Sequence, residues 1–128
     1  YISHTLEHLS HAKDLQPVLR QLFRLLQPDG KLMISVPDLD VICRLFVHPE
    51  ADTALRYHLM QILYGGQLDQ WDYHKVGFSA DILAAYLHEA GFTDLQQVEE
   101  FDLFDDNSSL TVAGQRISLN LVAVKPGA

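Results

Sequence analysis

The spacing of apolar residues predicts a first helix from Leu15 to Gln27. Apolar side chains recur there at every third or fourth position, which places them on one face of a helix. They are Leu15, Val18, Leu19, Leu22, Phe23 and Leu26. Asp14 is expected to cap the start, because its carboxylate accepts hydrogen bonds from the free N–H groups of a first turn. The turn Pro28-Asp29-Gly30 should end the helix.

Three segments have the pattern of strands. The nearly continuous apolar run from Lys31 to Val36 is typical of a strand that is buried on both faces of a sheet. A second strand is expected near Leu95–Phe101. The third, Arg116–Val124, alternates apolar and polar residues. Because only a polar connection, Asp102–Gln115, separates the last two strands, we expect them to pair antiparallel.

Three further helices are predicted, at about Asp40–Val47, Ala51–Leu63 and Ala80–Ala90. Ser79 is expected to cap the last of these, and Gly91 to end it in a left-handed conformation. The aromatic and polar stretch between Gly65 and Phe78 has no period, which indicates a loop.

Helices that alternate with buried strands indicate an α/β fold with a layered sheet. Three strands make a thin sheet for this number of helices, and the chain begins at Tyr1 with a pattern typical of the inside of a domain. We therefore expect these 128 residues to be part of a longer protein.

Composition narrows the classes of partner. The formal net charge is −8 and the nine Lys and Arg residues are scattered, which disfavours nucleic-acid binding. Nothing approaches the run of about 20 apolar residues that a membrane span needs. A single cysteine, Cys43, is expected to be a small buried side chain and favours a reducing, cytoplasmic location.

Three motifs, in this order, resemble class I S-adenosylmethionine-dependent methyltransferases. They are SHTLEHL at 3–9, LLQPDGKL at 25–32, and His74-x-x-x-Phe78-Ser79 followed by Ala90-Gly91-Phe92. In that family the first motif follows the fourth strand of a seven-stranded sheet, the second leads into the fifth strand, and the third precedes the sixth. The resemblance implies a partial Rossmann-like methyltransferase sheet, containing strands five to seven with the last two antiparallel, and flanking helices. Residues 1–128 would be the C-terminal half of a methyltransferase domain, with a substrate-side helical insertion at about 40–78.

The resemblance also implies S-adenosylmethionine as cofactor, approached by Ser3, His4 and Leu6 at the edge of the sheet where ligands of such folds bind. The alternative is that Ser3 and His4 only open a helix. The family's glycine-rich cofactor loop follows a strand, whereas Gly65-Gly66 follows a predicted helix. The fragment alone is therefore expected to be inactive.

Substrate contacts are assigned to Asp38, Trp71, Tyr73 and His74, and no catalytic residue is assigned. Asp38, or its neighbour Asp40, has the alternative role of capping a helix. His74 has the alternative role of bonding to backbone while the two aromatic residues cover the edge of the core. The helical insertion favours a small-molecule methyl acceptor.

Two other functions remain open. The domain could be a non-catalytic binding or dimerisation module, which pairs as a homodimer through an exposed sheet edge. His4-x-x-Glu7-His8 also matches the inverted zinc-peptidase motif, in which a helix carries two His ligands and a Glu base. That family needs a long helix and a downstream acidic ligand, so a zinc hydrolase is the weaker alternative and no metal ligand is assigned.

Overall fold

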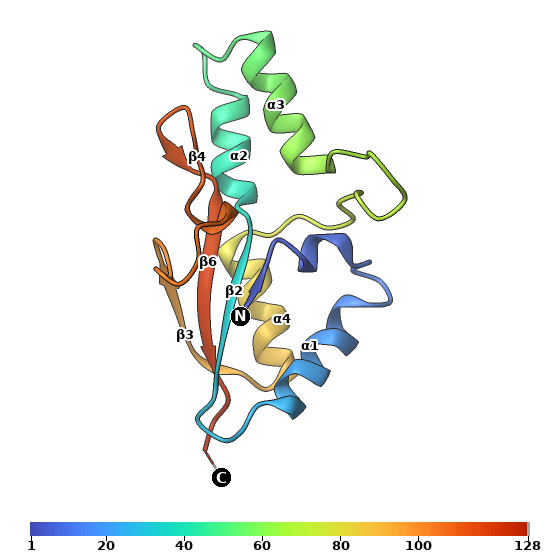
Figure 1. Ribbon diagram of the computed structural model, residues 1–128, viewed down its shortest axis with the longest axis vertical. Coiled ribbons are helices and arrows are strands. Elements are labelled where there is room, and N and C mark those ends of the chain that lie inside the picture. The colour runs from blue at the N-terminus through green and yellow to red at the C-terminus, as the bar shows by residue number, and fades with distance from the viewer. Residues whose placement is uncertain (128) are drawn as a thin grey trace.

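The computed structural model describes residues 1–127 (Figure 1). The helices are α1 (Leu15–Leu25), α2 (Leu39–Phe46), α3 (Thr53–Tyr64) and α4 (Ala80–Ala90), with short 3-10 turns η1 (Leu6–His8) and η2 (Asn107–Ser109). The strands are β1 (Ile2–Ser3), β2 (Lys31–Pro37), β3 (Thr93–Val98), β4 (Thr111–Val112), β5 (Gln115–Arg116) and β6 (Ser118–Val124). Every predicted helix and strand is present, and the α/β class is confirmed.

The main sheet has the order β1-β2-β6-β3. β1 and β2 are parallel, and β6 runs antiparallel to both of its neighbours, β2 and β3. The predicted antiparallel pairing of the last two strands is therefore confirmed. β1, β2 and β3 all point in one direction, so their carboxyl ends lie at the same edge of the sheet, beside the start of β6.

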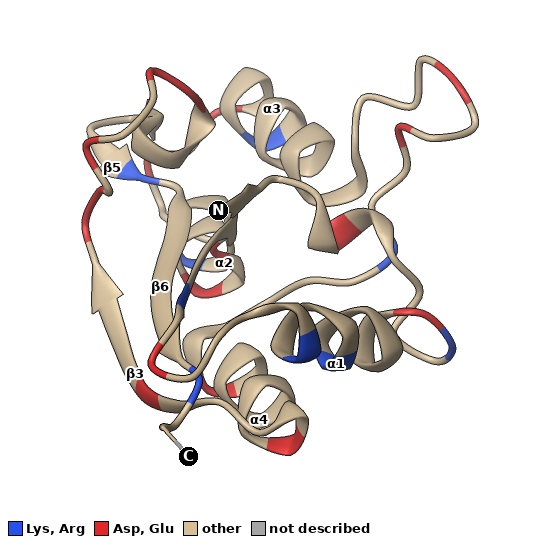
Figure 2. Ribbon diagram, turned by 60° about the horizontal axis from the view of Figure 1, so that its bottom comes forward, with Lys and Arg blue, Asp and Glu red and all other residues tan. Residues whose placement is uncertain are grey.

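One face of the sheet forms the main core. Alternate residues of β2 and β6 are buried there, and α1 and α4 lie side by side against them (Figure 2). The largest fully buried side chains of this core include Leu15, Leu19, Ile34, Phe78, Leu83, Leu87 and Phe92. Apolar burial of this extent stabilises the fold by roughly 25 cal/mol per Å² of apolar surface removed from water.

A second, smaller core lies beyond the end of the sheet, where α2 and α3 pack together (Figure 1). Its buried residues are Ile42, Leu59, Val112 and Ile117. The predicted burial of Cys43 is wrong, because Ile42 turns into this core and the neighbouring Cys43 side chain stays exposed. None of the helices within residues 1–127 is long and apolar enough to cross a membrane.

The helix ends agree with the sequence only in part. Asp14 makes no capping bond, because its carboxylate accepts a hydrogen bond from Ser10 Oγ at 3.0 Å instead. The predicted cap at Ser79 is also wrong, since its hydroxyl donates to the Asp81 carboxylate. Gly91 is left-handed as predicted, with φ +111°, and a Cβ there would lie 2.9 Å from Phe23 Cζ.

Candidate functional site

The carboxyl edge of the sheet gathers the segments that follow β1, β2 and β3. Backbone hydrogen bonds connect them: Asp38 N donates to Ile117 O at 2.8 Å, and Leu39 N donates to Phe78 O at 2.9 Å. The second bond brings the connector before α4 to the same edge. Open α/β sheets bind ligands at this edge, so we locate the candidate site here.

His4 follows β1 directly and has a left-handed backbone, with φ +49°. Its backbone N donates to Ser35 O at 2.7 Å, and its ring Nε2 lies 3.0 Å from Ser118 Oγ. The Ser118 hydroxyl donates its only hydrogen to Asn107 O at 2.6 Å. His4 Nε2 must therefore be the donor to Ser118 Oγ.

The other ring nitrogen of His4 faces Glu7. His4 Nδ1 lies 3.4 Å from Glu7 Oε2, and the Glu7 side chain is only 1% exposed. Since Nε2 already carries a hydrogen, a neutral His4 would point a lone pair at the carboxylate. An imidazole beside a carboxylate can accept a proton from a ligand at the sheet edge.

Glu7 also lies beside two more imidazoles, those of His8 and His74. The His8 and His74 rings meet edge to face, with centroids 4.7 Å apart. His74 Nδ1 lies 2.8 Å from Ile62 O, which confirms the alternative that His74 bonds to backbone. Burial lowers the pKa of His74, while the nearby Glu7 carboxylate acts in the opposite direction.

Asp38 has the capping role that the sequence left open. Its Oδ1 accepts hydrogen bonds from Asp40 N at 3.1 Å and Val41 N at 3.4 Å, at the start of α2. Burial raises the pKa of Asp38, against the effect of these two N–H donors. Asp38 also lines a hollow of about 430 Å³ together with Gln97, Arg116 and Ser118, among others. A ligand in that hollow can therefore reach Asp38 and, through Ser118, lies close to His4.

The other residues assigned to the cofactor occupy different environments. Ser3 is partly buried at the end of β1, in register with Ser35 of β2, whose buried Oγ has no hydrogen-bond partner. Leu6 is 1% exposed and packs in the main core. The predicted contact between Leu6 and the cofactor stays a prediction.

The aromatic connector is more open than the sequence suggested. Trp71 is 77% exposed and Tyr73 is 44% exposed, so neither side chain covers the core. The connector is shaped instead by turns of its own, in which Asp69 Oδ1 accepts from Trp71 N at 2.8 Å and Gln67 N donates to Asp72 O at 2.9 Å. The contact of Trp71 and Tyr73 with substrate stays a prediction.

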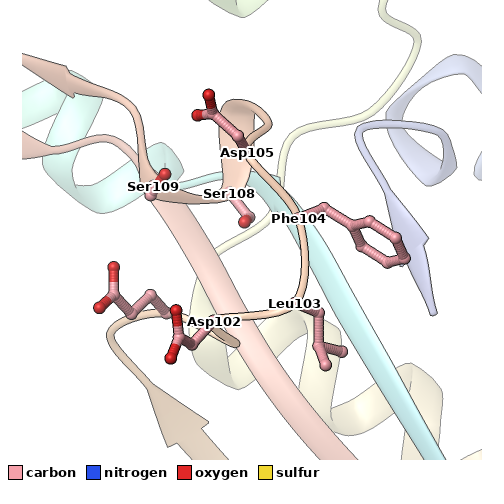
Figure 3. Close-up of a pocket in the computed structure, with 7 residues that line it drawn as sticks. Asp102, Leu103, Phe104, Asp105, Ser108 and Ser109 are labelled. Atoms are coloured by element: carbon pink, nitrogen blue, oxygen red, sulfur yellow. The ribbon is translucent and has the colours of Figure 1, made fainter.

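The loop after β3 forms a second hollow, which the sequence showed only as a polar connection. Its volume is about 360 Å³, and Figure 3 shows the lining. The lining residues are Glu100, Asp102, Leu103, Phe104, Asp105, Ser108 and Ser109. Phe104 points toward β1 and packs on Tyr1, with ring centroids 5.0 Å apart. Asn120 Nδ2 fixes the loop to β6 by donating to Glu99 O and Ser108 O.

The zinc-peptidase alternative is wrong on geometric grounds. Its motif needs a long α-helix, whereas η1 is a three-residue 3-10 turn and His4 lies before it. His4 and His8 therefore do not share a helical face. Within residues 1–127, Gly65 does end a helix, α3, as the sequence indicated, and no Gly-x-Gly loop joins a strand to a helix.

Comparison with known proteins agrees with this architecture. A family model described as a methyltransferase domain matches residues 1–97. No protein of curated function matches the chain significantly.

Two solved structures share the fold. One is described as a possible exported protein from Bordetella parapertussis, with 19% identity and a TM-score of 0.58 over 98% of this chain and 37% of that one. The other is the CurJ carbon methyltransferase, with 17% identity and a TM-score of 0.51 over 98% of this chain and 29% of that one. The chain thus spans about a third of the length of these structures. With the domain match over most of its residues, the chain belongs to the class I S-adenosylmethionine-dependent methyltransferase family.

Proposed function

We propose that this chain is part of a longer protein that transfers a methyl group from S-adenosylmethionine to a small molecule. The carboxyl ends of its strands would form one half of the active site. The observation that carries the proposal is the contact of His4, which belongs to the family's motif, with Ser118, which lines a hollow together with Asp38. The bound cofactor supplies an electrophilic methyl group on its sulfonium. The residues of this chain position the partners and hold a proton.

Part of the cofactor fits the residues present. Ser3 and His4 offer polar groups at the sheet edge where the family binds its ligand, and the buried hydroxyl of Ser35, in register with Ser3, has no hydrogen-bond partner. Residues 1–127 hold no Gly-x-Gly loop between a strand and a helix, and such a loop lets backbone approach a nucleotide closely. We therefore expect the isolated chain to be inactive and to bind the cofactor weakly.

The acceptor side supports a small-molecule substrate. The hollow of about 430 Å³ that contains Asp38 falls within the range of ~300–1,000 Å³ that is usual for small-molecule sites. Its lining combines polar groups, from Asp38, Gln97, Glu99, Arg116 and Ser118, with the side chains of Val41 and Val98. His4 contacts Ser118 of this lining, and its imidazole, with the Glu7 carboxylate 3.4 Å away, can accept a proton from a substrate nucleophile as the methyl group arrives.

A His4→Asn variant tests the assignment in the protein that includes the segment encoded upstream of Tyr1. We expect the longer protein to bind S-adenosylmethionine in a calorimetric titration, and the 128-residue chain to bind it at least about tenfold more weakly. His4→Asn should reduce methyl transfer by about 10²-fold or more, the usual contribution of a positioned proton-transfer group.

His11→Asn is the matched control, because His11 is an exposed histidine a short distance along the chain. It should leave binding and transfer unchanged. A longer protein that does not bind the cofactor would overturn the proposed function. Transfer that is unaffected by His4→Asn would overturn the role of His4 alone.

A further inference from the structure

Glu7, His8 and His74 form a compact cluster of side chains that can bind a metal. Each residue offers one ligand atom, and the three atoms all lie within 4.8 Å of one another. Glu7 and His8 belong to η1, whereas His74 belongs to the connector before α4, 66 positions further along the chain. Lys75 N donates to Glu7 O at 2.7 Å and holds the two segments together.

Two members of the cluster have buried polar atoms without partners. Glu7 is 1% exposed, and neither of its carboxylate oxygens accepts a hydrogen bond. His8 Nδ1 is also buried and unpartnered. A buried carboxylate is unfavourable unless it is paired or coordinates a metal, so an unsatisfied one indicates a missing partner.

His74 is oriented in the manner of a metal ligand. Its Nδ1 donates to the carbonyl of Ile62 at 2.8 Å, which leaves the lone pair on Nε2. Histidines that bind metals usually donate their other ring nitrogen to a carbonyl or carboxylate, which fixes the tautomer and the ring. The Glu7 carboxylate has a neighbour of the same kind: His4 lies 3.4 Å from Glu7 Oε2, as the Ile62 carbonyl lies beside His74. Oε1 of Glu7 stays free to bind a metal.

We propose that Glu7, His8 and His74 bind one Zn²⁺ ion. Two imidazoles and a carboxylate suit zinc better than magnesium or calcium, which prefer oxygen ligands. Tetrahedral ligands about 2.0–2.2 Å from zinc lie roughly 3.4 Å apart. Each pair of ligand atoms therefore needs to approach by about 1.4 Å at most to bind the ion. The ion would replace the missing partner of Glu7 and fasten the connector to the turn after β1.

The test is a zinc titration of the 128-residue chain after treatment with a chelator, in competition with a chromophoric zinc indicator. We expect one Zn²⁺ per chain, with a dissociation constant in the micromolar range or below, and a melting temperature that rises with zinc concentration. Glu7→Gln, His8→Gln and His74→Gln should each weaken binding by about tenfold or more. His11→Gln and His58→Gln, which alter exposed histidines, should not.

Co²⁺ provides a readout that needs no variant. A tetrahedral Co²⁺ site in the unaltered chain should give intense visible absorption, which zinc abolishes by displacement. Circular dichroism checks that each variant keeps its helices. Absence of one-to-one binding in the unaltered chain would overturn the proposal. Equal weakening by His11→Gln would overturn it as well, because the metal would then bind at the surface.

Discussion

Asp106 shows how strongly two neighbouring hydroxyl groups can act on one carboxylate. The hydroxyl of Ser108 and then that of Tyr1 donate to it, and they lower its pKa from 3.8 to about 2. A lowered pKa means that the unfolded chain binds the proton more tightly. The stability contributed by Asp106 is therefore present above pH 3.8 and is lost as the pH falls toward 2.

Asp106→Asn should reduce this loss of stability on acidification. We expect the free energy of unfolding to fall less steeply between about pH 4 and pH 2 in the variant than in the unaltered chain. Urea denaturation at a series of pH values measures the slope. Asp105→Asn is the control on the same loop, since Asp105 is exposed and makes no such bonds in the described structure. An equal change in both variants would contradict a specific role for Asp106.

Single residues also show where the sequence is ambiguous. Asp14, Asp38 and Ser79 all have side chains that favour helix starts, yet only Asp38 caps a helix. The other two have closer competitors for their hydrogen bonds, Ser10 and Asp81. Residue type therefore identifies a candidate cap, but the local competition between hydrogen bonds decides whether it forms.

At the scale of elements, the contact between α1 and α4 depends on Gly91. This residue ends α4 with φ +111°, where a Cβ would lie 2.9 Å from the ring of Phe23 on α1. Phe23 in turn packs edge to face on Phe92, with centroids 5.1 Å apart. A side chain at position 91 would therefore strain the backbone and also push α1 away from α4.

Gly91→Ala should lower the free energy of unfolding by more than the roughly 1 kcal/mol that a left-handed alanine alone costs. Gly114→Ala separates the two effects, because Gly114 also has a positive φ, +76°, but no atom lies within 4 Å of its Cβ position. Chemical denaturation of both variants gives the comparison. Equal losses would show that the contact with Phe23 contributes nothing.

The sequence predicted elements well where a period was long enough to recognise. Leu15 and Leu19 mark the buried side of α1, and β2 is buried along most of its length, as its apolar run indicated. β1, β4 and β5 are two-residue strands and carry no period of their own. Their pairing depends on partners elsewhere in the chain, such as Ile34 beside Ile2. No local pattern could therefore predict them.

At the scale of the molecule, the candidate site combines residues that are distant in sequence. Motif resemblance identified Ser3, His4 and His74 one by one, but not that His74 lies beside Glu7, or that His4 meets Ser118 across the sheet. These contacts follow from the strand order β1-β2-β6-β3, which places β6 between two strands that precede it in the chain. The alternation of apolar residues predicts each strand but not this order.

The free edge of β1 leads to a prediction about the isolated chain. Within residues 1–127, β1 pairs only with β2, so its other edge offers unpaired N–H and C=O groups. Residues on the sheet face opposite α1 and α4, including Met33 and Val122, are only partly buried. An exposed edge beside a partly apolar face favours pairing with a second strand. We propose that the isolated 128-residue chain forms a homodimer by joining two β1 edges.

Sedimentation equilibrium over a range of protein concentrations measures the mass of the particle. We expect a dimer that dissociates on dilution, because two-residue strands supply few hydrogen bonds across the new edge. The longer protein that we propose is the control. In the methyltransferase sheet that the motifs imply, strands from the preceding segment would cover this edge, and dimerisation through it should disappear. If the 128-residue chain is strictly monomeric, the two-residue edge of β1 does not pair with a second chain. That result would also remove the structural support for a dimerisation module.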